Sequence, residues 1–256
     1  MTSSPAHRAA TLRALHHPGD PLVLPNVWDA GSARAVVQAG FPAVATASAA
    51  VSQSLGYADG EGTPVGEMLA AVARITRAVE VPVTADLERG YRLSPAELVQ
   101  RLLDAGAVGL NLEDSDPYDG NLVDPGAQAE LLAGVRAAAE AAGVPIVINA
   151  RTDVFLRGYG EPAGRLDEAI RRARRYLAAG ADCVYPIMLA DPADLRTFVE
   201  AVAAPVNVLA HPAAPAPAEL AALGVARISY GPALYAATYA HTAELLTSVA
   251  AGDRLT

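Results

Sequence analysis

Four acidic side chains stand where they could share one cation. Asp86 and Glu88 lie two residues apart at the end of an expected strand, so both should project to the same side of it. Glu113 ends the next strand, and Asp59 lies in a long loop after an earlier one. Several carboxylates this close together cannot all stay ionised in a water-poor pocket without a cation. All-oxygen ligands favour Mg²⁺ or Mn²⁺, so we predict a metal site formed by these four acids.

The acids and the nearby Arg151 each have a second interpretation, as parts of the structure and not of a binding site. The acids could cap helices or pair with Arg89 and Arg92, but four acids on adjacent elements exceed what capping requires. Arg151 ends a strand of Ile, Val, Asn and Ala, where a guanidinium facing the acids suits a carboxylate or phosphoryl group. A structural ion pair with Asp153 or with one of the acids explains Arg151 equally well, and both interpretations stay open.

Small and polar residues at two other strand ends are candidates for substrate binding. Thr46, Ala47 and Ser48 form a turn that can present backbone N–H groups and hydroxyls to an anion, although small residues also simply permit tight packing. Asn207 lies on the seventh expected strand and is included in this set. Cys183 lies inside a strand, where we expect it to pack rather than react.

A repeated junction predicts how these residues are positioned. A helical stretch ends in a small residue and a glycine, which can take the left-handed conformation, and a β-branched run follows. The glycines of this pattern are Gly40, Gly106, Gly143, Gly180 and Gly224. Strands are expected near residues 22–25, 43–47, 82–87, 108–113, 145–150, 183–187, 206–210 and 227–230. Eight strands that alternate with helices predict an α/β fold, a (β/α)8 TIM barrel, whose active site lies at the carboxyl ends of the strands.

Helix starts are equally legible. Ser94, Thr63, Asp124 and Asp191 each precede a proline, the usual order of a capping residue and Pro at the first helical position. An extra helix is expected near residues 5–17, before the first strand. No linker or shift in composition divides the chain, so we expect a single barrel domain over residues 1–256. An open doubly wound sheet is the alternative, but no Gly-x-Gly-x-x-Gly turn follows the first strand.

The composition excludes several classes of protein. The chain is 52% hydrophobic and 18% charged, which rules out disorder. A net charge of −9 argues against a nucleic-acid or anionic membrane surface, and no apolar run reaches the length of a membrane span. With one cysteine and no signal-peptide pattern, we expect a cytoplasmic protein without a disulfide. Four histidines are expected at the surface: His7, His16, His17 and His241.

Several of these segments together resemble the isocitrate lyase/phosphoenolpyruvate mutase superfamily. The resemblance covers almost the whole chain and rests on the order of its motifs. They are residues 24–29 (LPNVWD), 56–60 (GYADG), 85–91 (ADLERGY), 111–114 (NLED), 149–153 (NARTD) and 207–210 (NVLA).

The resemblance implies a Mg²⁺-dependent enzyme that makes or breaks a C–C or P–C bond next to a 2-oxo acid, with the metal stabilising an enolate. It implies that Asp86 contacts the metal directly, while Asp59, Glu88 and Glu113 hold its waters. The turn at residues 46–48 would bind the substrate carboxylate, and Arg151 would face the substrate. It also implies a homo-oligomer, a dimer or tetramer, formed through the region of the last helix near residues 232–250.

Two sequence differences from the lyases of the superfamily limit the substrates that we expect. The isocitrate and methylisocitrate lyases carry a Lys-Lys/Arg-Cys-Gly-His loop after the fourth strand, whereas residues 115–123 here read SDPYDGNLV. The lyases tend to have Glu after the proline of strand six, where this chain has Ile187. Cleavage of a tricarboxylate is therefore not expected. We expect a lyase or decarboxylase acting on an oxaloacetate-like acid, with residues 114–124 as a lid. One alternative is P–C bond chemistry on phosphonopyruvate or phosphoenolpyruvate, in which Asp59 or a metal-bound water would take part as a catalytic group. The other is 2-oxo acid binding without turnover.

Overall fold

The strands of the computed structural model, which describes residues 3–254, all pair in parallel. They are β1 (Leu22–Leu24), β2 (Asn26–Val27), β3 (Val44–Thr46), β4 (Val83–Asp86), β5 (Gly109–Glu113), β6 (Val147–Thr152), β7 (Cys183–Pro186), β8 (Asn207–Leu209) and β9 (Arg227–Ser229). They form one sheet in the order β2 to β7 and another in the order β1-β9-β8.

The two sheets close into the predicted barrel. β1 and β2 are one continuous strand interrupted at Pro25, which has no N–H to donate to a neighbour. Before Pro25 this strand pairs with β9, and after it the strand pairs with β3. A bridge between Val184 and Val206 joins β7 to the segment entering β8. With β1 and β2 counted as one, the described residues form eight barrel strands, and the (β/α)8 prediction is confirmed.

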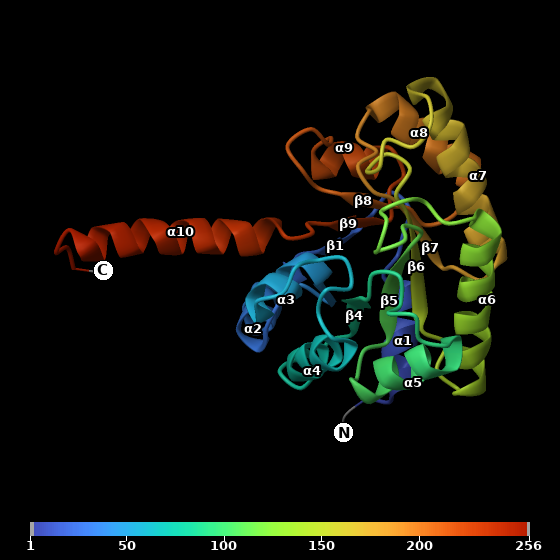
Figure 1. Ribbon diagram of the computed structural model, residues 1–256. Helices are drawn as coiled ribbons and strands as arrows, with labels where there is room; N and C mark the ends of the chain where they lie inside the picture. Colours follow the sequence, from blue (N-terminus) through green and yellow to red (C-terminus); the bar gives the residue numbers. More distant parts are fainter. Residues whose placement is uncertain (1–2, 255–256) are drawn as a thin grey trace.

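Helices surround the barrel strands (Figure 1). They are α1 (Pro5–Ala14), α2 (Ala30–Gln38), α3 (Ser48–Leu55), α4 (Val65–Thr76), α5 (Pro95–Asp104), α6 (Pro125–Ala141), the 3₁₀ turn η1 (Pro162–Gly164), α7 (Arg165–Ala178), α8 (Pro192–Val202), α9 (Pro217–Ala222) and α10 (Ala233–Ala250). Ser94, Asp124 and Asp191 accept backbone N–H groups as predicted caps. Thr63 does not, because its hydroxyl donates to Ser52 Oγ (2.7 Å) and Pro64 occupies the cap position of α4.

The amino-terminal end of the barrel is closed by α1. Ala9 and Leu12 of α1 are fully buried and pack with Leu22, Leu24 and neighbouring strand residues. The apolar residues of this end exclude water from the bottom of the barrel, so any solvent-accessible chemistry is confined to the opposite end.

His16 follows α1 and is buried, so the expectation that it lies at the surface is wrong. Its Nδ1 lies 2.8 Å from the Leu12 carbonyl oxygen, and only 8% of the residue is exposed. Burial, together with the positive charge of Arg227, lowers the pKa of His16 to about 4. Its helical spacing from Leu12 was the available signal: i and i+4 share a face, and Leu12 is a core residue.

The buried His16 predicts a pH-dependent stability. In the unfolded chain His16 becomes protonated below its ordinary pKa of about 6.5. In the folded protein the His16 imidazole stays neutral down to about pH 4. The free energy of unfolding should therefore fall as pH drops from 6.5 to 4, by up to about 3 kcal/mol from His16 alone. Urea denaturation of wild type and His16→Asn across this range measures that share, since Asn can still donate to the Leu12 carbonyl. Parallel pH curves for the two proteins would contradict the prediction.

The last helix leaves the barrel. Figure 1 shows α10 projecting away from the strands and from the other helices. No residue of this 18-residue helix is buried, and only its base makes aromatic contacts, with Trp28 against Tyr235 at a centroid distance of 5.2 Å. Of the helices within residues 3–254, none has the length and apolar character that a bilayer crossing requires.

Candidate active site

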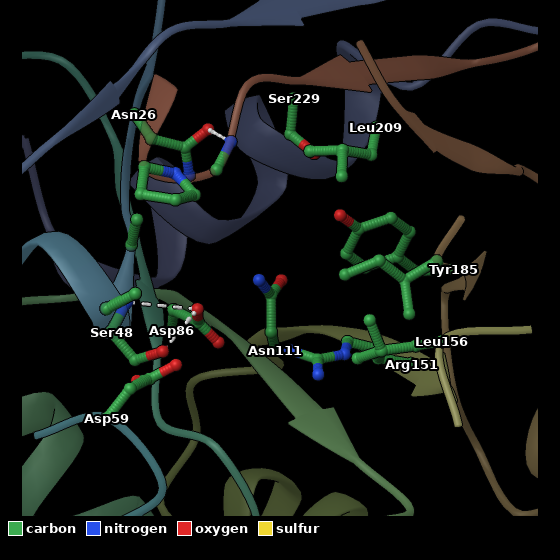
Figure 2. Close-up of a pocket in the computed structure, with 15 residues that line it drawn as sticks. Asn26, Ser48, Asp59, Asp86, Asn111, Arg151, Leu156, Tyr185, Leu209 and Ser229 are labelled. Atoms are coloured by element: carbon green, nitrogen blue, oxygen red, sulfur yellow. Dashed lines mark hydrogen bonds between the residues drawn. The ribbon is translucent and has the colours of Figure 1, made fainter. Parts of the chain in front are cut away.

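A cavity of about 190 Å³ opens at the carboxyl ends of the strands. Figure 2 shows its polar lining, with Asp59, Asp86 and Ser48 on one side and Arg151 and Tyr185 on the other. The complete lining is Asn26, Ala47, Ser48, Ala49, Asp59, Asp86, Asn111, Arg151, Leu156, Tyr185, Ile187, Leu209, Ser229, Gly231 and Pro232. One wall is therefore anionic and another carries a guanidinium, in a space that fits a small acid.

Asp86 ends β4 and is held by the turn that follows β3. Its Oδ2 accepts hydrogen bonds from the backbone N–H and the hydroxyl of Ser48, at 3.1 and 3.0 Å. Its own N–H donates to Thr46 Oγ1 at 2.9 Å. Thr46 is fully buried and lies outside the cavity lining, whereas Ala47 and Ser48 reach it. The predicted small-residue turn thus orients an acid and also contributes to the wall.

Asp59 lies beside Asp86 and Ser48 in the cavity lining (Figure 2). Burial, which keeps water away from the carboxyl group, raises the pKa of Asp59, and the negative charge of Asp86 raises it further. Within the described residues neither acid forms an ion pair. The interpretation that Arg89 and Arg92 neutralise them is therefore not what the geometry shows; Arg92 instead stacks on the Tyr118 ring at 3.6 Å.

Glu88 is buried beside these acids but is absent from the cavity lining. Since β4 ends at Asp86 and Glu88 has a φ of 51°, the two-residue alternation assumed from the sequence does not extend to it. Its carboxylate accepts the Tyr91 hydroxyl at 2.8 Å and the backbone N–H of Glu61. Burial, with the charge of Asp59, raises the pKa of Glu88 to about 7. The contacts of Glu61 and Tyr91 with Glu88 were not predicted from the sequence.

Glu113 is bound to Arg151 instead of standing free. Arg151 Nη1 lies 2.6 Å from Glu113 Oε2, and its Nε and Nη2 contact Asp153 at 2.6 and 3.0 Å. Burial raises the pKa of Glu113 despite the opposing charge of Arg151. The structural interpretation of Arg151 is therefore realised, and Arg151 also lines the cavity, so the two roles left open by the sequence coexist.

The donors around the cavity suit a hard divalent cation. Across residues 3–254, no three side chains of His, Cys, Asp or Glu converge on one point, so the predicted four-acid cluster is divided. Asp86 and Asp59 alone bring carboxylates to the cavity, without a cationic partner. Mg²⁺ is commonly held by one or two carboxylates and several waters, which this pair could provide. A Mg²⁺ ion fits the donor set and stays a prediction.

Asn207 does not reach the cavity. It is fully buried within the barrel, where Nδ2 donates to Ser229 Oγ at 3.2 Å. Asn26, Asn111, Tyr185 and Ser229 do line it, although none of them was predicted as a site residue. Each occupies or follows an expected strand, so inward alternation was the signal that could have found them.

The fold and this cavity define a (β/α)8-barrel enzyme with its site at the carboxyl ends of the strands. The chain belongs to the isocitrate lyase/phosphoenolpyruvate mutase superfamily, because the family model described as phosphoenolpyruvate phosphomutase matches residues 12–250. The resemblance drawn from the motifs is thereby confirmed. Relatives of this chain in the superfamily include 2-methylisocitrate lyases and a phosphoenolpyruvate phosphomutase, and the prediction of an enzyme of this superfamily is confirmed.

Three relatives show how similar the chain is to other proteins in sequence and structure. A crystal structure of a candidate phosphonomutase from Burkholderia cenocepacia is 45% identical, with a TM-score of 0.89, covering 94% of this chain and 99% of that one. An uncharacterized protein of Mycobacterium tuberculosis is 34% identical over 94% of this chain and 89% of its own length. The oxaloacetate decarboxylase of Rhodopseudomonas palustris is 32% identical over 80% of this chain and 72% of its own length.

Proposed function

We propose that the protein is a Mg²⁺-dependent lyase or decarboxylase that acts on a small 2-oxo dicarboxylate such as oxaloacetate. The observation that carries the proposal is the pairing of Asp59 and Asp86 with Arg151 around a single cavity of about 190 Å³. The acids suit a cation, and the guanidinium suits a substrate carboxylate. The similarity to an oxaloacetate decarboxylase supports the same substrate class.

The residues of the chain divide the work of such a reaction. Asp86, with Asp59 nearby, would hold Mg²⁺, which when bound supplies positive charge to the oxygens of a 2-oxo acid. Arg151 orients the far carboxylate, and its ion pairs with Glu113 and Asp153 keep the guanidinium in place. Burial raises the pKa of Tyr185 to about 12, so its hydroxyl keeps its proton at neutral pH and can donate a hydrogen bond within the cavity.

A loop over residues 114–124 is the proposed lid. It contains a short bridge between Ser115 and Leu122, and Tyr118 is 67% exposed beneath the Arg92 guanidinium. The loop offers no Cys, His or Lys as a proton donor. This composition supports a substrate smaller than a tricarboxylate and leaves proton donation to groups of the cavity wall.

Phosphorus–carbon bond chemistry is the second candidate function. The match to the phosphoenolpyruvate phosphomutase family model and the 45% identity to a candidate phosphonomutase favour it. A phosphonate presents the same negative charge to Arg151 as a carboxylate does. Binding of 2-oxo acids without turnover is the third candidate, since the lid lacks a proton donor.

One panel of substrates separates these functions. Purified protein with Mg²⁺ is offered oxaloacetate, methylisocitrate, phosphonopyruvate and phosphoenolpyruvate, and products are followed by ¹H and ³¹P NMR. Pyruvate and CO₂ from oxaloacetate support the first function, and phosphorus-containing products support the second. Binding without product supports the third. Rapid methylisocitrate cleavage would contradict the argument from the lid sequence.

We also propose that the protein is a homo-oligomer, a dimer or tetramer, assembled through α10. Tyr239, Leu246 and Val249 lie along one stripe of this projecting helix and are 50%, 62% and 48% exposed. An 18-residue helix with no buried residue and this apolar stripe is poorly stable in water without a partner.

The α10 interface gives a direct prediction. Leu246→Lys places a charge on the apolar stripe and should shift the assembly toward monomer in sedimentation equilibrium. Glu244→Lys introduces the same side chain about 200° around the helix and should leave the assembly intact. A wild-type protein that sediments as a monomer at micromolar concentration would contradict the prediction.

A further inference from the structure

A polar layer lies inside the barrel, just beneath the cavity. The interior of such barrels is ordinarily filled by Val, Ile and Leu. Here the register of β5 and β6 sets Asn111 opposite Asn149, and the register of β8 and β9 sets Asn207 opposite Arg227. The exposed fraction of these four residues does not exceed 7%.

Asn111 is the member of this layer that reaches the cavity. Its Oδ1 accepts hydrogen bonds from Asn149 Nδ2 at 2.9 Å and from Arg227 Nη2 at 3.3 Å. A guanidinium has no lone pair with which to accept a hydrogen bond, so the atom of Asn111 that faces Arg227 must be the oxygen. Arg227 therefore decides which way the amide is turned.

The fixed amide leaves Nδ2 of Asn111 on the cavity side. Figure 2 shows the amide between Asp86 on one side and Tyr185 and Arg151 on the other. In the described part of the chain, Nδ2 has no side-chain or backbone acceptor. An N–H pair held in this way presents donors to whatever occupies the cavity.

Arg227 adds a positive charge below the same point. The residue has no exposed surface, and it forms no ion pair with any acid between residues 3 and 254. Its Nε and Nη1 likewise find no acceptor there. A buried cation with no paired carboxylate favours negative charge on a nearby ligand, because the field is weakly screened in the protein interior.

We propose that Asn111 is a substrate-binding residue whose Nδ2 donates to an anionic oxygen of the 2-oxo acid, and that Arg227 is the residue that positions its amide. This inference rests on the proposed function for the identity of the ligand. The Asn111 donor favours ligands whose end nearest to it carries only acceptor oxygens. Such an end is a carboxylate, a 2-oxo group or the enolate derived from it. A ligand with a hydroxyl or amine donor at that end is disfavoured.

Binding of oxalate in the presence of Mg²⁺, measured by titration calorimetry, tests the inference without turnover. Oxalate carries the adjacent oxygens of a 2-oxo acid. Asn111→Asp keeps acceptors for Asn149 and Arg227, so its melting temperature should stay close to wild type. Its carboxylate replaces the donor with a repelling charge, and we expect oxalate to bind at least about 100-fold more weakly. Asn111→Ser should weaken binding about tenfold.

Two further variants separate ligand binding from a general disturbance of the barrel interior. Asn207→Ser, the same change in the same layer away from the cavity, should alter oxalate affinity less than about threefold. Arg227→Met should weaken oxalate about tenfold in the wild-type background, and less than threefold when Asn111 is already serine. An equal loss in both backgrounds would show that Arg227 does not act through the Asn111 amide, whether its role is structural or comes from its charge alone.

Each outcome decides the inference separately from the proposed function. Oxalate affinity within threefold of wild type in both Asn111 variants overturns it, as does an equal loss in Asn207→Ser. A wild-type protein that binds no oxalate overturns it whatever its turnover. Oxalate binding that depends on Asn111, in a protein that converts none of the panel substrates, leaves the inference standing while the proposed lyase function fails.

Discussion

Asp86→Ala is expected to lower the rate of oxaloacetate decarboxylation by about 1,000-fold or more in the presence of Mg²⁺, which corresponds to about 4 kcal/mol of lost transition-state stabilisation. Asp86 brings to the cavity a carboxylate that is oriented by two hydrogen bonds from Ser48 and has no cationic partner in the described chain. Asp59 remains, but it lies in the loop that follows α3 and not at the end of a strand. We therefore do not expect it to replace the lost ligand.

The measurement is pyruvate formation at several Mg²⁺ concentrations. Wild type should lose activity when EDTA removes the ion, whereas Asp86→Ala should respond little to Mg²⁺ at any concentration. Asp104→Ala, at an exposed acid that accepts a hydrogen bond from Gln100 and lies outside the cavity, is the matched control and should keep full activity. A rate for Asp86→Ala within tenfold of wild type would remove Asp86 from the site.

The barrel could be predicted from the sequence because its signals are local. Five helices (α2, α5, α6, α7 and α9) are followed by a glycine and then by a strand, and Gly40, Gly106 and Gly180 adopt the positive φ that this ending requires. The break at Pro25 was not predicted, although a proline without an N–H was visible in the printed sequence. It matters little to the fold because the strand pairs on different sides before and after it.

The partners of the acids could not be predicted because they depend on register. Glu113 and Arg151 lie directly opposite each other on β5 and β6, an offset that no local pattern specifies. The sequence therefore supported both a metal-site acid and an ion-paired acid, and the structure realises the ion pair.

Asn111 escaped notice for a different reason. Most candidate residues on the middle strands were charged, whereas Asn26, Asn111 and Ser229 bring neutral amides and a hydroxyl to the cavity. Asn111 precedes Glu113 by two residues on β5, as Asn149 precedes Arg151 on β6. Extending the same alternation inward from each charged residue would have placed both amides inside the barrel.

The second large effect is expected at Arg151. Arg151→Met leaves Glu113 and Asp153 without their cation, and the side chains of these acids are only 9% and 0% exposed. Removing one partner of a buried ion pair typically costs about 3–5 kcal/mol, because the remaining charge stays buried. We expect a loss of this size at pH 7 in urea denaturation. Arg171, whose side chain is 56% exposed where it pairs with Glu168, gives the matched control: Glu168 keeps its second partner Arg172, and Arg171→Met should cost less than about 1 kcal/mol.

The loss in Arg151→Met should depend on pH with a defined sign. Burial already raises the pKa of Glu113 in the folded protein, and removal of Arg151 raises it further. The folded variant then binds a proton that the unfolded chain does not, so its stability relative to wild type recovers as pH falls from 7 toward 5. Adding Glu113→Gln should recover part of the loss at pH 7, since it removes the unpaired charge. A deficit that is independent of pH and insensitive to Glu113→Gln would show that the methionine disturbs packing rather than electrostatics.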